Sequence, residues 1–209
     1  MVLVFQLAAL IFSVIVHEVS HGVMALRLGD TTAKDAGRLT LNPVKHLDLF
    51  GSFIVPLTLF ILSGGSFVIG WAKPVPYNPY NLKNPKLGSG LIGAAGPFSN
   101  FILAVVFGLL IRLLVPYAEI QMIATLIYLF NIVVFVNILL GVFNLVPLPP
   151  LDGANILFSI LPKSWAPVQG FLQQYGFYLL ITFMFFGFQL IVPIIEFLYR
   201  LIVGSVIGS

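Results

Sequence analysis

Two histidines and a glutamate near the start of the chain have the spacing of a metal-binding hydrolytic motif. They are His17, Glu18 and His21, in the run His-Glu-Val-Ser-His. Residues four apart on a helix lie one above the other, so both imidazoles can reach one metal ion while the carboxylate lies beside it. Metallopeptidases use this arrangement, with the histidines as zinc ligands and the glutamate as general base. The motif therefore predicts metal-assisted hydrolysis.

The motif lies in a segment that looks built to cross a membrane. Residues 1–26 are almost entirely apolar, and no charged residue precedes His17. The segment lacks a basic start and a small-residue cleavage site, so we expect a membrane helix rather than a cleaved signal peptide. Ionisable groups inside such a helix usually mark a functional site. An ordinary pair of buried, hydrogen-bonded histidines is the alternative.

Composition supports a polytopic membrane protein. Of the 209 residues 59% are hydrophobic and only 8% are charged, against about 25% charged residues in soluble domains. The net charge of +3 is thus no argument for a nucleic-acid partner, because the basic residues of such a chain set its orientation and meet anionic lipid headgroups. The chain has no cysteine, so any metal must be held by histidine, aspartate or glutamate.

The chain reads as one membrane domain over residues 1–209. About twenty apolar residues span a bilayer, and two basic connectors, 27–49 and 71–90, separate the first apolar stretches. We expect an all-α polytopic membrane protein, a transmembrane helix bundle. The apolar stretches are 1–26, 50–70, 91–115, 120–146 and 171–203.

A third metal ligand is needed, because catalytic zinc usually takes three protein ligands and leaves a position for water. Asp152 is the best candidate among the seven acidic residues of the chain. It follows a proline-rich stop at 147–150 and opens the segment 154–161. The alternative is that Asp152 only caps that segment.

Three separated motifs resemble the site-2 protease family of intramembrane zinc metalloproteases. They are residues 17–21, Ala-Gly-Pro-Phe-Ser-Asn at 95–100, and 144–153, which ends in Leu-Asp-Gly. Residues 37–43 and 70–75 resemble a compact prokaryotic branch. The resemblance implies that His17, His21 and Asp152 bind one catalytic Zn²⁺ and that Glu18 acts as general base.

A simple serpentine topology conflicts with this metal site. If each apolar stretch crossed once, Asp152 would lie on the opposite face from the end of the first helix. The conflict disappears if residues 50–90 enter the membrane and return to the side they left, with 63–66 near the turn. Irregular backbone is tolerated at that depth where it lines a polar cavity. We therefore predict a re-entrant segment next to the zinc site.

The return leg of that segment, residues 66–77, has a composition that favours extended backbone. Pro74 and Pro76 restrict it to a sheet edge, which can pair with a substrate strand. A connector that dips into the interface is the alternative.

The distribution of basic residues predicts the orientation. With the N-terminus outside, eight of the ten lysines and arginines face the cytoplasm, as the positive-inside rule expects. We expect a multi-pass protein of the cell (inner) membrane with its active site toward the cytoplasmic face. The eight residues are Arg27, Lys34, Arg38, Lys45, Lys73, Lys83, Lys86 and Lys163.

Amide side chains are the candidate stabilisers of the oxyanion, since an amide gives a hydrogen bond without adding charge to an apolar site. Asn100 and Asn144 are the candidates, and Asn137 is expected to bond between helices. His46, in a basic connector, is expected to contact solvent or the interface rather than the metal.

These features predict an intramembrane zinc metalloprotease that hydrolyses peptide bonds within or near transmembrane segments of protein or peptide substrates in the lipid bilayer, as in regulated intramembrane proteolysis. The alternative from another class is a metal-ion or proton transporter that uses the same His/Glu/Asp cluster. A transporter needs ionisable residues at several depths, whereas 91–115 and 120–146 offer only asparagines and terminal charges. A second alternative is a non-catalytic scaffold that binds membrane helices.

Overall fold

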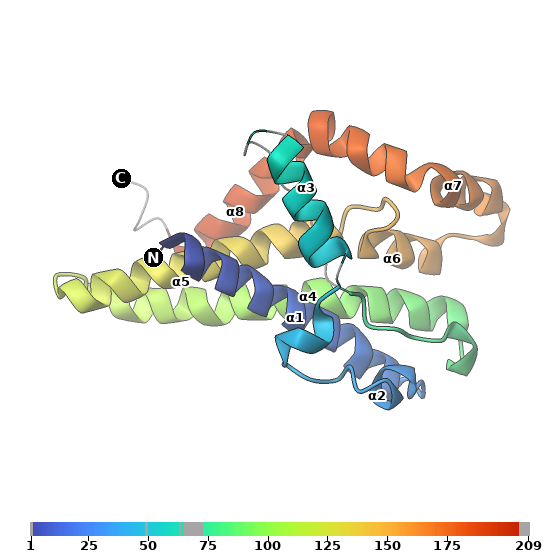
Figure 1. Cartoon of the computed structure of the whole chain (residues 1–209), viewed down its shortest axis with the longest axis horizontal. Helices are drawn as coiled ribbons and strands as arrows, with labels where there is room; N and C mark the ends of the chain where they lie inside the picture. Colours follow the sequence, from blue (N-terminus) through green and yellow to red (C-terminus); the bar gives the residue numbers. More distant parts are fainter. Residues whose placement is uncertain (1, 49, 63, 65–72, 205–209) are drawn as a thin grey trace.

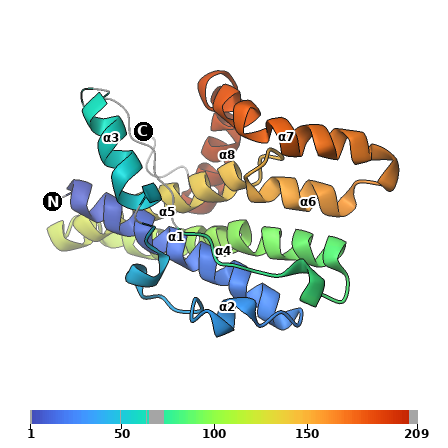
Figure 2. The same cartoon turned by 45° about the vertical axis from the view of Figure 1, so that its right-hand side comes forward.

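A computed structural model describes residues 2–48, 50–62, 64 and 73–204. Within these residues the chain forms helices and irregular segments but no strand, so the prediction of an all-α protein is confirmed. Three long helices form the centre of the molecule (Figures 1 and 2), namely α1 (Val2–Arg27), α4 (Pro85–Leu114) and α5 (Gln121–Asn144), and each contacts the other two.

Helix length and composition identify a multi-pass membrane protein. Four helical segments in the described part of the chain are long and apolar enough to cross a bilayer. A helix rises about 1.5 Å per residue, so even the 24-residue α5 covers the roughly 30 Å of hydrocarbon. The four segments are Val2–Arg27, Pro85–Tyr117, Gln121–Asn144 and Lys163–Leu190.

Two of the predicted apolar stretches differ in extent from the helices that the structure forms. The stretch expected to begin at 91 begins at Pro85, because the side chain of Asn84 accepts a hydrogen bond from the Leu87 N–H and caps the helix. The last stretch, expected at 171–203, is divided into α7 (Ala166–Thr182) and α8 (Val192–Val203). The break between them consists of a π turn, Phe183–Gly187, and a 3-10 turn, Phe188–Leu190.

Short elements connect the long helices. The one that matters most for the site is α6 (Asp152–Ile160), which packs on α4. The others are α2 (Thr32–Asp35), 3-10 turns at Pro43–His46, Pro79–Asn81, Val115–Tyr117 and Lys163–Trp165, a π turn at Phe50–Ile54, and α3 (Val55–Leu62).

The apolar core lies where α4, α5 and α8 meet. Ile111, Val134, Ile138 and Val203 are almost completely buried there. Outward-facing apolar side chains on the same helices, such as Leu113 of α4, stay exposed. An exposed apolar surface of this kind is the expected outer face of a bundle surrounded by lipid.

The chain just before the segment predicted to be re-entrant, residues 50–90, lies next to the middle of that segment. The N–H of Lys73 donates a hydrogen bond to the carbonyl of His46, at 2.9 Å. Between these residues, α3 projects away from the bundle of α1, α4 and α5 (Figures 1 and 2). Because residues 63 and 65–72 lie outside the described part of the chain, re-entry into the membrane stays a prediction. The described part of the extended return leg, residues 73–77, forms no strand.

A buried carboxylate fixes the start of α4 beside the end of α1. Asp30 accepts hydrogen bonds from the backbone and hydroxyl of Thr32, from the Asn78 N–H at 2.7 Å and from the Asn81 amide at 2.7 Å. Burial acts to raise the pKa of Asp30, but the hydrogen bonds outweigh it and hold the pKa below its ordinary value. The end of the 50–90 segment is thus tied to the end of α1.

Candidate active site

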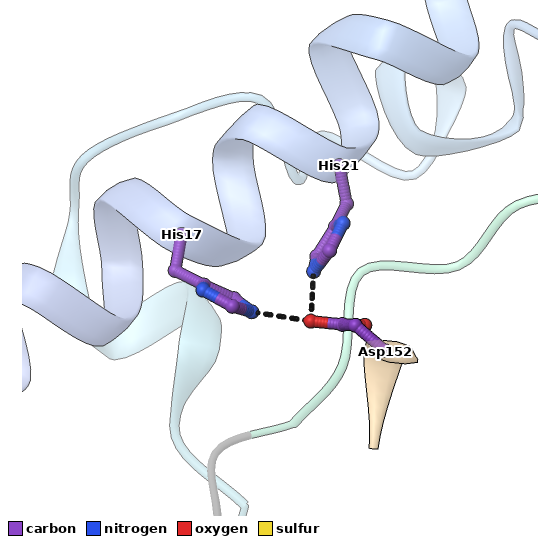
Figure 3. A group of neighbouring side chains, drawn as sticks. All are labelled: His17, His21 and Asp152. Atoms are coloured by element: carbon purple, nitrogen blue, oxygen red, sulfur yellow. Dashed lines mark hydrogen bonds and ion pairs between the residues drawn. The ribbon is translucent and has the colours of Figure 1, made fainter. Parts of the chain in front are cut away.

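Two histidines of α1 and one aspartate of α6 converge on a single point (Figure 3). His17 Nε2 lies 2.9 Å from Asp152 Oδ2, and His21 Nε2 lies 3.3 Å from the same oxygen. One donor atom from each of the three residues lies within 4.8 Å of the others. The sequence resemblance therefore selected three residues that the fold brings together.

The local structure explains how Asp152 reaches the histidines. Helix α5 ends at Asn144, and the chain reverses into α6. The reversal is tight, because a Cβ on Gly153 would overlap with the Leu145 carbonyl oxygen. Leu151 occupies the N-cap of α6 and no side chain caps the helix. The alternative, that Asp152 only caps this segment, is therefore wrong, and its carboxylate extends toward the histidines of α1 instead.

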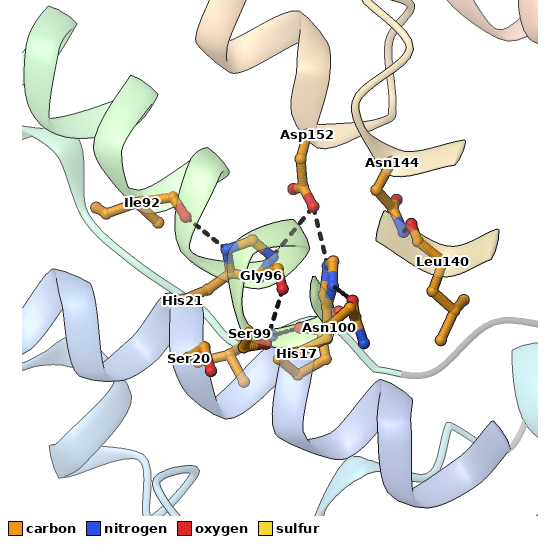
Figure 4. A network of polar contacts seen from close by, with 12 residues as sticks. His17, Ser20, His21, Ile92, Gly96, Ser99, Asn100, Leu140, Asn144 and Asp152 are labelled. Carbon is orange, nitrogen blue, oxygen red and sulfur yellow. Dashed lines mark hydrogen bonds and ion pairs between the residues drawn. The ribbon is translucent and has the colours of Figure 1, made fainter. Parts of the chain in front are cut away.

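Each histidine is oriented by a hydrogen bond at its other ring nitrogen (Figure 4). His21 Nδ1 donates to the Ile92 carbonyl at 2.6 Å, and His17 Nδ1 donates to Asn100 Oδ1 at 2.6 Å. With the proton on Nδ1, a neutral imidazole presents an unprotonated Nε2. Partners of this kind are typical of metal-binding histidines.

Behind His17 lies a fully buried network of amides that joins the three central helices. Asn100 of α4 uses both amide hydrogens, toward Asn137 Oδ1 at 2.9 Å and the Ser13 carbonyl at 3.4 Å. Asn137 of α5 donates to Ser13 Oγ of α1 at 2.9 Å. The prediction that Asn137 bonds between helices is confirmed. Ser13 was not among the residues expected at the site, although its hydroxyl in an otherwise apolar stretch was the available signal.

A glycine keeps the space in front of the two imidazoles open. A Cβ on Gly96 of α4 would lie 2.5 Å from His17 Nε2 and 2.5 Å from His21 Nε2. A tetrahedral zinc ion with ligands at about 2.0–2.1 Å separates its donor atoms by roughly 3.4 Å, close to the distances found between the histidine and Asp152 donors. The donor set, the oriented rings and the open space all fit zinc.

Glu18 lies on the same helix and contacts the segment that precedes α4. Its Oε2 accepts a hydrogen bond from the Val75 N–H at 2.8 Å. The approach is close, because a Cβ on Gly22 would lie 2.8 Å from a Val75 methyl group. The return leg of the 50–90 segment therefore reaches the candidate general base.

Two further candidates have other hydrogen-bond partners than the three zinc ligands. Asn144 is half-buried near Asp152 (Figure 4), and its amide donates to the Leu140 carbonyl of its own helix at 3.0 Å. The expectation that His46 contacts solvent is wrong, because its side chain is buried and its Nε2 donates to the Thr40 carbonyl. His46 is not part of the metal-binding group found among the described residues.

Comparison with known proteins gives one family. The family model described as Peptidase family M50 matches residues 5–126 and 115–187. The chain is 42% identical over 172 residues to YwhC of Bacillus subtilis (strain 168), named as a candidate zinc metalloprotease, and the match covers 80% of this chain and 74% of that protein. No solved structure matches significantly.

Two other relatives carry names of the same kind. The candidate zinc metalloprotease Rip2 of Mycolicibacterium smegmatis (strain ATCC 700084 / mc(2)155) is 27% identical over 183 residues, 88% of this chain and 67% of that protein. The candidate zinc metalloprotease MJ0611 of Methanocaldococcus jannaschii is 28% identical over 169 residues, 80% of this chain and 76% of that protein.

Proposed function

The chain belongs to peptidase family M50, and we propose that its catalytic centre is the cluster of His17, His21 and Asp152 in the membrane. The protein is a membrane-embedded zinc metallopeptidase that acts on membrane proteins. The proposal rests on one observation: three potential donor atoms, from α1 and α6, lie close together. His17, His21 and Asp152 would hold the ion, and the hydrogen bonds at both Nδ1 atoms keep both Nε2 atoms available for it.

Glu18 is the general base of this proposal. When bound, zinc supplies a Lewis acid that activates water and polarises the scissile carbonyl. Glu18 takes a proton from the attacking water while the water oxygen bonds to the carbonyl carbon. It then gives that proton to the amine nitrogen when the C–N bond breaks. The hydrogen bond from the Val75 N–H to Glu18 Oε2 holds the carboxylate in place next to the histidines of the same helix.

The two asparagines have different tasks. Asn100 has no amide hydrogen left for a substrate and orients the His17 ring, which makes it a positioning residue. Asn144 donates one of its two amide hydrogens to the Leu140 carbonyl. The other can donate a hydrogen bond to the oxyanion that forms on the scissile carbonyl. The role of Asn144 stays a prediction.

The substrate follows from the setting of the site. A peptide bond inside a membrane helix is shielded by backbone hydrogen bonds, so cleavage requires a locally unwound stretch. We propose single-span substrates cut within or near the membrane, in the cytoplasmic half of the cell membrane. The excess of basic residues in the connectors next to the site supports this orientation.

The transporter alternative has no support. The relatives are named as proteases, and the described residues gather potential metal-binding side chains into one group rather than at several depths.

Cleavage by the purified protein tests the function. In phosphatidylglycerol–phosphatidylcholine vesicles, we expect zinc-loaded protein to cut a single-span model protein, with new termini mapped by mass spectrometry to the span or its cytoplasmic border. Chelation should stop cleavage and added zinc should restore it, whereas added magnesium should not. Cleavage that continues after the zinc content has fallen below a tenth of an equivalent would contradict the proposal.

Replacing Asn100 tests its positioning role. The variant Asn100→Ala loses the acceptor for His17 Nδ1, so we expect zinc affinity to fall by about 10- to 100-fold, the usual effect of losing a partner of a ligand. At saturating zinc, kcat should recover to within about threefold of the wild-type value. The measurements are zinc titration and steady-state kinetics.

The matched control is Asn131→Ala, which removes a membrane asparagine bonded to Tyr199 and away from the cluster. It should leave zinc affinity unchanged. If Asn100→Ala instead keeps wild-type zinc affinity but loses kcat at saturating zinc, Asn100 acts on the oxyanion and the positioning role is wrong.

A further inference from the structure

A basic cavity lies between the connector after α1 and the segment before α4, apart from the zinc ligands. Its volume is about 450 Å³. Three of its lining residues are cationic, Arg38, Lys45 and Lys73, and none is acidic. The other lining residues are alanine, valine, leucine and proline. We propose that this cavity binds the phosphate headgroup of an anionic phospholipid.

The guanidinium of Arg38 is the buried and fixed cation of this cavity. The residue is only 7% exposed, and its Nη2 donates to the carbonyls of Lys73 at 2.6 Å and Pro74 at 3.2 Å. Its Nε is buried without a hydrogen-bond partner among the described residues. A buried cation normally has a counter-charge, and a phosphate group in the cavity, which Arg38 lines, supplies that charge.

Lys45 and Lys73 bring two more positive charges to the same cavity. Both side chains are exposed, and the ion pairs formed within the described residues involve neither lysine nor Arg38. Three cations around one cavity repel each other unless an anion lies between them. Phosphate, with several strong acceptor oxygens, suits one arginine and two lysines better than a single carboxylate does.

The surroundings of the cavity favour a lipid as the source of the phosphate. Leu41 and Val44, on the same connector, are 57% and 70% exposed, and Leu47 is also exposed. Apolar side chains next to cations are the pattern of a surface that rests on an anionic membrane. The connector follows the membrane helix α1 directly, so the headgroup and the start of the acyl chains lie within its reach.

Occupancy of this cavity has a consequence for the catalytic centre. Arg38 and Lys45 belong to the connector, whereas Lys73 lies two residues before Val75, whose N–H holds Glu18. A headgroup bound to all three cations ties the connector to the segment that contacts the general base. The lipid would therefore stabilise the position of Val75.

Native mass spectrometry of the purified full-length protein in detergent tests this proposal. The protein is titrated with dioleoylphosphatidylglycerol or with dioleoylphosphatidylcholine. We expect one tightly retained phosphatidylglycerol and no retained phosphatidylcholine. The double variant Lys45→Gln/Lys73→Gln should weaken this binding by roughly 30-fold, about fivefold for each lysine. Both lysines are exposed, so the variant should fold.

The control is Lys34→Gln/Lys83→Gln, which removes two exposed charges from the same connectors outside the cavity. It should retain phosphatidylglycerol as the wild type does. Equal weakening by both double variants, or equal retention of the two lipids, would mean general surface attraction and would overturn the proposal. Displacement of phosphatidylglycerol by millimolar inorganic phosphate or by an acidic peptide would assign the cavity to a soluble ligand and would overturn it too.

Discussion

Replacing Glu18 with glutamine is expected to stop peptide hydrolysis while leaving zinc bound. The introduced amide cannot accept the proton of the attacking water, and general acid–base catalysis contributes about 10²- to 10⁴-fold, so kcat should fall by that factor. The amide oxygen still accepts the hydrogen bond from the Val75 N–H, so the adjoining segment should stay in place. Zinc content by mass spectrometry and cleavage of a single-span substrate are the measurements.

The control for this variant is Glu196→Gln, at an exposed glutamate of α8 that pairs with Arg200. An exposed pair one helical turn apart contributes little to stability, so wild-type cleavage and zinc content are expected. If Glu18→Gln cleaves within threefold of the wild-type rate, Glu18 is not the general base. If it loses its zinc, the loss of activity has another cause and the assignment of roles fails.

The variant Gly96→Ala is expected to lose zinc, and with it activity, although no donor atom is removed. The added methyl group would lie 2.5 Å from atoms of both imidazoles. The rings cannot move aside without breaking their bonds to Asn100 and Ile92, and overpacking of this kind costs typically about 1–3 kcal/mol. We expect less than a tenth of an equivalent of zinc, with helical content by circular dichroism unchanged.

Gly170→Ala is the matched control. A Cβ at this position of α7 meets nothing within 4 Å, so zinc content and activity should equal those of the wild type, with a gain in stability of up to about 1 kcal/mol from better helix propensity. Stoichiometric zinc in Gly96→Ala would show that the space in front of the imidazoles is not the metal position.

The sequence was sufficient for the parts of the site that depend on local geometry. His17, Glu18 and His21 lie on successive turns of one helix, and helical periodicity alone places the two imidazoles together. Asp152 is far along the chain, and only the resemblance of three ordered motifs to a known family selected it. The three long central helices followed from length and composition, because lipid imposes both.

The remaining features depend on how separate helices pack, which periodicity does not specify. Gly96 and Asn100 face the histidines only because α4 packs against α1 at this part of the helix. Ser13 contacts Asn137 only because α5 packs against α1. The burial of His46 depends on the connector folding back on α1. The early start of α4 depends on the cap that Asn84 provides, which outweighed the apolar pattern.

The wide separation of the zinc ligands along the chain affects the timing of activity during synthesis. His17 and Asp152 are 135 residues apart. Between them lie α4, which supplies Asn100 as the partner of His17, and α5, whose Asn137 bonds to Asn100. A nascent chain that has reached only α5 contains both histidines and the glutamate but lacks the third ligand. Such an unfinished chain cannot assemble the complete ligand set. Other membrane proteins are therefore not cleaved by it until translation has passed Asp152.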